Sequence, residues 1–314
     1  RDICHAPYVQ LKEQFLAHDI CVNTPDMANG DRLTLDLHMN AGTTTNELLS
    51  YALLFETPFI HPANGDVAIL AQYRKLFTWD DRLVDGKRFI KLNFPNPVSV
   101  PVADGMAGRD VFCCVIAGNK TVAVPTPLEL YRERVRVIRW FEKNAPADFV
   151  LYGIGWDKPS PAEGPAWKPL RKLWRSWKKR TGGFAFPSYH GMVSEKKAVL
   201  QNARFCICYE NVRDLPGYIT EKIFDCFFHG CVPVYWGASN VHDYIPEDCF
   251  IDRRRFSSTA AVYRHLKAMD EATFVRYQQN IIRFLQSEKM YPFSTGHFVT
   301  TVVDTGLADI DANR

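Results

Sequence analysis

Residues 205–240 constrain the fold of this chain more than any other stretch. Two short apolar runs, 205–209 and 232–236, flank a segment whose apolar residues recur with helical spacing. Thr220 is a good N-cap residue, and Gly230 stands where a helix C-cap belongs. The pattern predicts a strand, a helix and a second strand. Because strands joined in this way run parallel in one sheet, we expect an α/β fold with parallel sheets.

Polar residues follow the first of these strands and open the predicted helix. Open α/β sheets bind their ligands at this end of the strands, and a helix N-terminus attracts anions. Lys222, in the first helical turn, is unfavourable to the helix dipole unless an anion is near, so it points to a phosphate-bearing ligand. The alternative is that Lys222 simply faces solvent. The candidate ligand-binding residues here are Glu210, Asn211, Tyr218, Thr220, Glu221 and Lys222.

Several classes of nucleotide-binding protein are disfavoured. The chain has no Walker loop and no G-x-G-x-x-G, so a P-loop nucleotidase or a Rossmann dehydrogenase lacks its fingerprint. A net charge of +3 is too small to indicate nucleic acid as the main partner. The nine cysteines include no C-x-x-C, so we expect buried thiols of a reducing compartment rather than a zinc site.

The length of 314 residues predicts two domains. Residues 95–110 carry three prolines and two glycines and are predicted to be the linker. We therefore expect one domain over 1–108 and a second over 109–288, which contains a Pro/Gly/Trp-rich insertion at 153–187. The C-terminal segment 289–314 can pack back on the first domain.

Glu56 ends an apolar strand and precedes Thr57 and Pro58. A carboxylate in such a place has a raised pKa and can act as a general base if it lines a cleft. A solvated glutamate at the end of a strand is the alternative, and the sequence alone does not choose between them.

An arginine-rich helix is expected after Thr126, where 126–129 reads as a capping box with proline at the first helical position. The arginines of this helix include Arg134. An arginine that faces a cleft can neutralise a diphosphate. The alternative is a solvated surface. Further along, 167–180 has the composition of an interfacial amphipathic helix, which can dock on an anionic membrane or pack on the protein's own surface. Residues 271–285 are predicted to form another amphipathic helix.

The acidic residues do not suggest a metal site. Asp80 and Asp81 are adjacent, and the one D-x-D, at 309–311, lies in the terminal tail. We expect no required metal and no other cofactor.

The run CYENVRDLPGYITEKIFDCFFHGCVPVYWGAS closely resembles the signature of the α1,3/α1,4-fucosyltransferases, glycosyltransferase family 10. LLFETPFIHPAN resembles the family's upstream strand that ends in glutamate, with Thr57 in place of the usual serine. IAGNK, LYRERVRVIRWF and VLYGIGW resemble the segment that opens the donor domain in bacterial members. The resemblance covers roughly residues 45–300.

This resemblance implies a GT-B architecture, in which two Rossmann-like domains face each other across a cleft. It implies inverting transfer of L-fucose from GDP-β-L-fucose. Glu56 aligns with the family's proposed general base and Arg134 with the arginine that contacts the diphosphate. Lys222 would neutralise the departing β-phosphate, and Glu221 would hold fucose or ribose hydroxyls. Asn211 and Tyr218 also fall on donor-binding positions.

The expected acceptor is an oligosaccharide or lipid-linked glycan that contains GlcNAc and is fucosylated at its 3- or 4-hydroxyl. Alternatives are a relative that uses another GDP-sugar and a non-catalytic glycan- or nucleotide-binding module. No apolar run reaches about 18 residues, so no transmembrane helix is predicted. We expect a cytoplasmic protein that can lie on the inner membrane, or a Golgi-lumen protein if the chain is a trimmed catalytic domain.

Overall fold

The computed structural model describes residues 6–23, 27, 35–44, 50–163, 169, 173 and 185–312. The chain divides into two compact units. Unit 1 is Ser99–Ser287, and unit 2 combines Asp2–Val98 with Glu288–Arg314. Each unit is built around its own parallel sheet.

Unit 1 contains a five-stranded parallel sheet with the order β6-β5-β7-β8-β9. The predicted strand–helix–strand unit is confirmed, since α6 joins β7 to β8 and these strands pair in parallel, with Tyr209 opposite Trp236. Thr220 is the N-cap of α6, and its side chain accepts a hydrogen bond from the Lys222 N–H. The strands are β5 (Val111–Ile116), β6 (Phe149–Tyr152), β7 (Ala203–Tyr209), β8 (Val232–Trp236) and β9 (Ile251–Asp252), and α6 is Glu221–Phe227.

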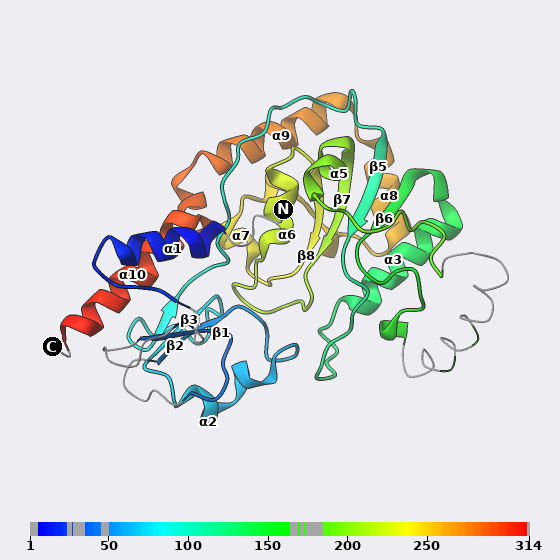
Figure 1. The fold of residues 1–314 in the computed structure, drawn as a ribbon. Coiled ribbons are helices and arrows are strands. Elements are labelled where there is room, and N and C mark those ends of the chain that lie inside the picture. The colour runs from blue at the N-terminus through cyan, green and yellow to red at the C-terminus, as the bar shows by residue number, and fades with distance from the viewer. Residues whose placement is uncertain are drawn as a thin grey trace. The chain divides into compact units, whose positions relative to one another are not determined.

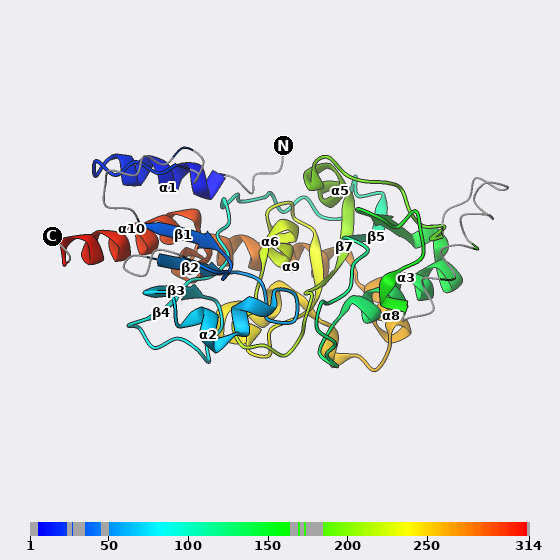
Figure 2. The ribbon, with the colours of Figure 1, turned by 60° about the horizontal axis from the view of Figure 1, so that its bottom comes forward.

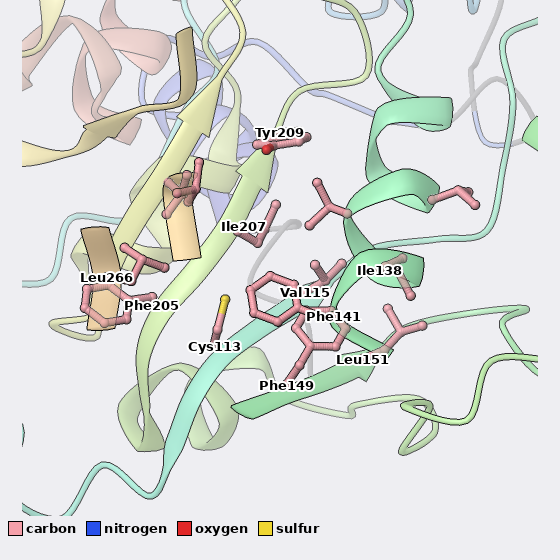
Figure 3. Packing of buried hydrophobic residues seen from close by; sticks show 14 of the residues in the cluster. Cys113, Val115, Ile138, Phe141, Phe149, Leu151, Phe205, Ile207, Tyr209 and Leu266 are labelled. Atoms are coloured by element: carbon pink, nitrogen blue, oxygen red, sulfur yellow. The ribbon is translucent and has the colours of Figure 1, made fainter. Parts of the chain in front are cut away.

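Helices cover both faces of this sheet (Figure 1). On one face, α3 (Tyr131–Asn144) and α8 (Thr259–Ala268) share a core with the strands. Figure 3 shows Phe141 of α3 against Phe149, and their rings stack with centroids 4.7 Å apart. On the other face, α6 contacts β7 and β8, and α5 (Lys196–Asn202) contacts β7. The predicted amphipathic helix α9 (Glu271–Leu285) contacts α6 and β8, and its Phe274 belongs to the core shared with α3 and α8. This doubly covered sheet explains why the strands read as continuous apolar runs.

The start of α3 differs from the prediction. The capping box at 126–129 predicted a helix from Pro127, but the helix begins at Tyr131. The Thr126 hydroxyl accepts a hydrogen bond from the Leu128 N–H, and Glu129 bridges to Val212 of the segment after β7. Long-range backbone pairing therefore takes up the residues that local capping would have placed in the first helical turn.

The boundary between the units also lies earlier than the predicted division after residue 108. Residues 99–108 belong to unit 1 because they hydrogen-bond to α9. The Gly105 N–H donates to Gln278 Oε1 over 2.9 Å, and the Met106 N–H donates to Glu271 Oε1 over 2.9 Å. The segment predicted to be the linker is thus divided, with residues 95–98 in unit 2 and residues 99–110 in unit 1.

Unit 2 holds a four-stranded parallel sheet with the order β1-β2-β3-β4. Helices α1 and α10 lie side by side next to this sheet (Figure 2). Phe15 of α1 and Phe298 of α10 share a core with Tyr51 of β2. The bounds are α1 (Ala6–Leu16), β1 (Asp36–Met39), β2 (Ser50–Leu54), η3 (Pro62–Gly65), α2 (Val67–Leu70), β3 (Lys75–Thr78), β4 (Phe89–Lys91), η8 (Glu288–Phe293) and α10 (Thr295–Asp311).

Two hydrogen-bonded contacts hold α10 and its approach within unit 2. The Asn96 N–H donates to the Phe293 carbonyl over 2.8 Å, and the Thr295 N–H donates back to Asn96. Farther along, Asp309 accepts from Tyr51 Oη at 2.5 Å and from Arg74 Nε at 2.8 Å. The C-terminal segment is therefore an integral part of the unit formed by the N-terminal residues.

Candidate donor site in unit 1

The strand order of unit 1 reverses beside β5. The chain passes from β5 to β6 on one side and then to β7 on the other, so the carboxyl ends of β5 and β7 flank a topological switch point. Open α/β sheets bind ligands outside such a point. Glu210 and Asn211 follow β7 directly at this edge, and Figure 3 shows Tyr209 at the end of that strand.

Glu210 is the centre of a hydrogen-bond network at the N-terminus of α6. Its side chain is fully buried, with 0% exposure. Oε1 accepts from the Thr220 N–H at 2.8 Å and from Tyr235 Oη at 3.5 Å. Oε2 accepts from Thr220 Oγ1 at 2.7 Å and from Lys222 Nζ at 3.2 Å. One carboxylate thus fixes the cap of α6 and the lysine in its first turn.

Lys222 retains its charge in this network. Burial alone would lower its pKa, but the negative charges of Glu210 and Glu221 outweigh burial and hold the pKa well above its ordinary value. The Lys222 side chain keeps 23% of its exposure, and Nζ lies 3.7 Å from Glu221 Oε1. The lysine is therefore partly accessible and cationic. Its side chain is neither fully solvated nor fully enclosed.

Glu221 is the exposed partner, since 45% of its side chain remains accessible. Burial pushes its pKa upward, but the charges of Lys222 and Lys196 hold the pKa below its usual value. Glu221 is thus an anionic acceptor of hydrogen bonds at the start of α6, as binding of sugar hydroxyls requires.

Arg134 does not lie on a solvated arginine face. It is 3% exposed, and its Nη2 donates to the carbonyls of Tyr209 at 2.9 Å and Glu210 at 3.3 Å. Its guanidinium carbon lies 5.1 Å from the centroid of the Tyr131 ring. Arg134 therefore brings a positive charge from α3 to the end of β7. The neighbouring arginines Arg132, Arg136 and Arg139 instead pair with glutamates three residues away on or beside α3.

Asn211 and Tyr218 complete the predicted group in unit 1. The Asn211 carbonyl accepts from the Leu130 N–H at 3.0 Å, which joins the loop after β7 to the start of α3. Tyr218 is fully buried, and its hydroxyl lies close enough to Lys222 and Arg134 to influence the pKa of each. The structure thus brings all five predicted donor residues to the region between β7, α3 and α6.

Glu210, Tyr235 and Gly237 support this group, and of these only Glu210 was singled out from the sequence. Glu210 was among the polar candidates, but its role as the central acceptor depends on its burial. Tyr235 donates to Glu210 from β8, and Gly237 leaves room for both, since a Cβ at 237 would lie 2.2 Å from Tyr235 Oη and 2.5 Å from Glu210 Cγ. The glycine after an apolar strand was the available signal for this close approach.

Glu56, the sixth predicted residue, belongs to unit 2, where it follows β2 and is partly exposed. The predicted membrane-docking stretch 167–180 lies outside the described residues apart from Pro169 and Leu173, so that docking and the cellular location stay predictions. Within the part of the chain that is described, no helix combines the length and apolar character needed to cross a membrane.

Three of the acidic residues considered for a metal are engaged in ion pairs. Asp80 pairs with Arg82, Asp81 with Lys91, and Asp309 with Arg74. Among the described residues, no group of three or more His, Cys, Asp or Glu side chains is arranged to hold a metal ion. The described cysteines are free thiols, and all except Cys21 are buried.

Comparison with known families accounts for this arrangement. Residues 175–290 match the model of the glycosyltransferase family 10 (fucosyltransferase) C-terminal domain. This part of the chain belongs to glycosyltransferase family 10. A 4-galactosyl-N-acetylglucosaminide 3-α-L-fucosyltransferase 9 of Mus musculus is 34% identical over 108 residues, which are 33% of this chain and 29% of the relative. An α-(1,4)-fucosyltransferase of Arabidopsis thaliana is 33% identical over 72 residues, 23% of this chain and 18% of the relative.

The chain therefore matches less than a third of the length of these curated relatives. A solved α1,3-fucosyltransferase with GDP extends the likeness in fold, with a TM-score of 0.54 and 12% identity over 95% of this chain and 84% of that one. Another structure described as an α1,3-fucosyltransferase gives a TM-score of 0.51, also at 12% identity over 95% and 84% of the two chains. The fold is GT-B, the class predicted from the sequence.

Proposed function

We propose that this protein transfers L-fucose from GDP-β-L-fucose, with inversion, to the 3- or 4-hydroxyl of a GlcNAc-containing glycan. The observation that carries the proposal is the charged group at the switch point of unit 1, in which Glu210, Lys222 and Arg134 converge. Glu210 and Lys222 lie within the stretch that matches the family 10 model. The name of the Mus musculus relative, a 4-galactosyl-N-acetylglucosaminide 3-α-L-fucosyltransferase, supports the acceptor class.

The donor side of the proposal rests on two cations held in place by the fold. Lys222 extends from the first turn of α6, where the helix dipole also favours a negative group. Arg134 is fixed by two carbonyls at the end of β7. We assign the diphosphate of the donor to these two residues, the sugar or ribose hydroxyls to Glu221, and further donor contacts to Asn211 and Tyr218.

In the proposed reaction, the acceptor hydroxyl attacks C1 of fucose while the bond from C1 to the β-phosphate oxygen breaks. GDP leaves with the bonding electron pair, and Lys222 neutralises the charge that develops on the β-phosphate. Glu56 takes the proton of the attacking hydroxyl, a step typically worth about 10²–10⁴-fold in rate. The single displacement inverts the configuration at C1.

Two substitutions test the assignment of roles. E56Q removes the base and should abolish transfer while leaving the affinity for GDP unchanged, because Glu56 lies in unit 2 and the donor residues lie in unit 1. K222A should lose both GDP binding and transfer. Titration calorimetry with GDP and a fucosylation assay on N-acetyllactosamine measure the two effects. Normal transfer by E56Q would show that Glu56 is not the base.

The choice of donor and the independence from metal need their own measurements. A panel of GDP-sugars tests whether fucose is preferred, and NMR of the product identifies the linkage. We expect the transfer rate to be unchanged in EDTA, because Lys222 and Arg134 supply the positive charge that a divalent ion would otherwise provide. GDP binding without turnover on any glycan acceptor would instead indicate a non-catalytic binding module.

A further inference from the structure

The backbone of Glu56 is held by side chains from other parts of unit 2. Its N–H donates to Asn40 Oδ1 at 2.9 Å, and its carbonyl accepts from Asn64 Nδ2 at 2.8 Å. One residue earlier, the carbonyl of Phe55 accepts from Trp79 Nε1 at 3.0 Å. Because the backbone sets the direction in which a side chain leaves the chain, these bonds determine where the Glu56 carboxylate can reach.

Asn40 and Asn64 form a connected asparagine pair around Glu56. Asn64 Nδ2 donates to Asn40 Oδ1 over 2.9 Å, and Asn64 Oδ1 accepts from the Ala41 N–H at 2.8 Å. Asn64 is 3% exposed, so its amide is both buried and engaged in three hydrogen bonds. A buried amide that loses a hydrogen-bond partner costs free energy, so movements that break these hydrogen bonds are disfavoured. The complete pair is therefore rigid.

Two features of the backbone near the asparagine pair depend on the residue type. Asn40 adopts a left-handed backbone conformation with φ of +63°, which few residues other than glycine and asparagine tolerate. Gly65, next to Asn64, lies so close to the turn after Glu56 that a Cβ would come within 2.8 Å of Pro58 Cβ. The residue types at 40 and 65 therefore suit the backbone conformation and the close packing found around Glu56.

We propose that Asn40 and Asn64 are positioning residues, which hold Glu56 in the orientation needed to remove the proton from the acceptor hydroxyl. This inference rests on the proposed function, in which Glu56 is the base. Neither asparagine touches the reacting atoms in this scheme. Each acts through the backbone of Glu56.

The first test separates the hydrogen bonds from the backbone conformation. N40G keeps the left-handed backbone accessible but removes the side-chain acceptor. N40D retains an oxygen that accepts from Glu56 and Asn64 as the native amide oxygen does. We expect kcat of N40G to fall by about 10–100-fold, as for a small misplacement of a catalytic group. N40D should recover most of that loss, and the affinity for GDP should stay the same in both.

A matched control and a second variant guard against general loss of structure. D19G changes an exposed residue of the same unit that, like Asn40, has a left-handed backbone, with φ +60°, and it should leave transfer unchanged. N64A removes the other half of the pair and should lower kcat in the same way. Circular dichroism spectra and melting temperatures report which variants are folded.

Combination with E56Q decides whether the asparagines act through Glu56. If they do, N40G should reduce the residual rate of E56Q little or not at all, because groups acting as one unit are not additive. A further loss of the same size as in the wild-type background would overturn the proposal, as would normal kcat in both folded N40G and folded N64A. If instead the wild-type protein transfers no fucose, or E56Q is fully active, the assignment of Glu56 itself fails.

Discussion

The ion pair between Glu210 and Lys222 can be tested by replacing its members singly and together. In E210Q the shape of residue 210 is kept, but Lys222 Nζ loses the carboxylate oxygen 3.2 Å away. At an effective dielectric constant of about 20, this separation corresponds to roughly 5 kcal/mol of attraction, which desolvation offsets in part. Removing one partner of a fully buried pair typically costs about 3–5 kcal/mol.

Lys222 keeps 23% of its side-chain exposure, so water screens part of this loss. We therefore expect E210Q to destabilise the region of β7 and α6 by about 2–3 kcal/mol. K222M should also be destabilising, because Glu210 remains buried without its cation. The double variant E210Q/K222M should be more stable than the sum of the two losses predicts, by at least about 1 kcal/mol, since it leaves no buried charge unpaired.

Amide hydrogen exchange followed by mass spectrometry measures the loss of local stability, on peptides that cover residues 203–227. A loss of about 2–3 kcal/mol corresponds to exchange faster by roughly 30–150-fold. Because the pKa of Lys222 is raised, its contribution is fully present below the unfolded value of about 10.4 and disappears only as pH rises through the raised folded value. The destabilisation caused by E210Q should thus be constant from neutral pH to about 9. Additive single effects would refute the ion-pair explanation.

Two further substitutions test the supports around each sheet. G237A should prevent GDP binding and lower the stability of unit 1 by about 2–4 kcal/mol, because its Cβ would overlap the buried Tyr235 hydroxyl. Calorimetry with GDP measures the binding and urea unfolding measures the stability. Wild-type values in both would contradict the packing argument. D309N should lower the melting temperature at neutral pH, since burial tends to raise the Asp309 pKa but hydrogen bonds from Arg74 and Tyr51 hold that pKa below its usual value. That contribution is present above the unfolded pKa of about 3.9 and is lost as pH falls through the folded value, so wild type and D309N should melt alike in strong acid.

The central strand–helix–strand unit was predictable because its signals are local. Apolar runs mark β7 and β8, Thr220 caps α6, and polar residues follow β7 in the order that a ligand site requires. Helix α9 was predicted with the same bounds that it has in the structure, Glu271–Leu285, since its apolar stripe is regular. Where neighbouring residues in the sequence decide the conformation, pattern and structure agree.

Other features depend on contacts between residues far apart in the chain. Arg134 shares its helix with three other arginines, and no spacing rule shows that this one is buried against the carbonyls of β7. Glu210 could equally have been a solvated strand-end carboxylate. The predicted helix start at Pro127 was wrong because Glu129 forms a β-bridge with Val212, a residue far away in the sequence. Tertiary hydrogen bonding overrode local preference in each case.

The membership of α10 in unit 2 has a consequence for the order in which the protein folds. Unit 1 is one continuous stretch, so all of its strands are available once residue 287 has been synthesised. The core of unit 2 needs Phe298 and Val302 of α10 against Phe15 and Tyr51, and the α10 residues are synthesised after all of unit 1. The sheet of unit 2 therefore keeps part of its apolar face uncovered until unit 1 has been synthesised and α10 can pack against it.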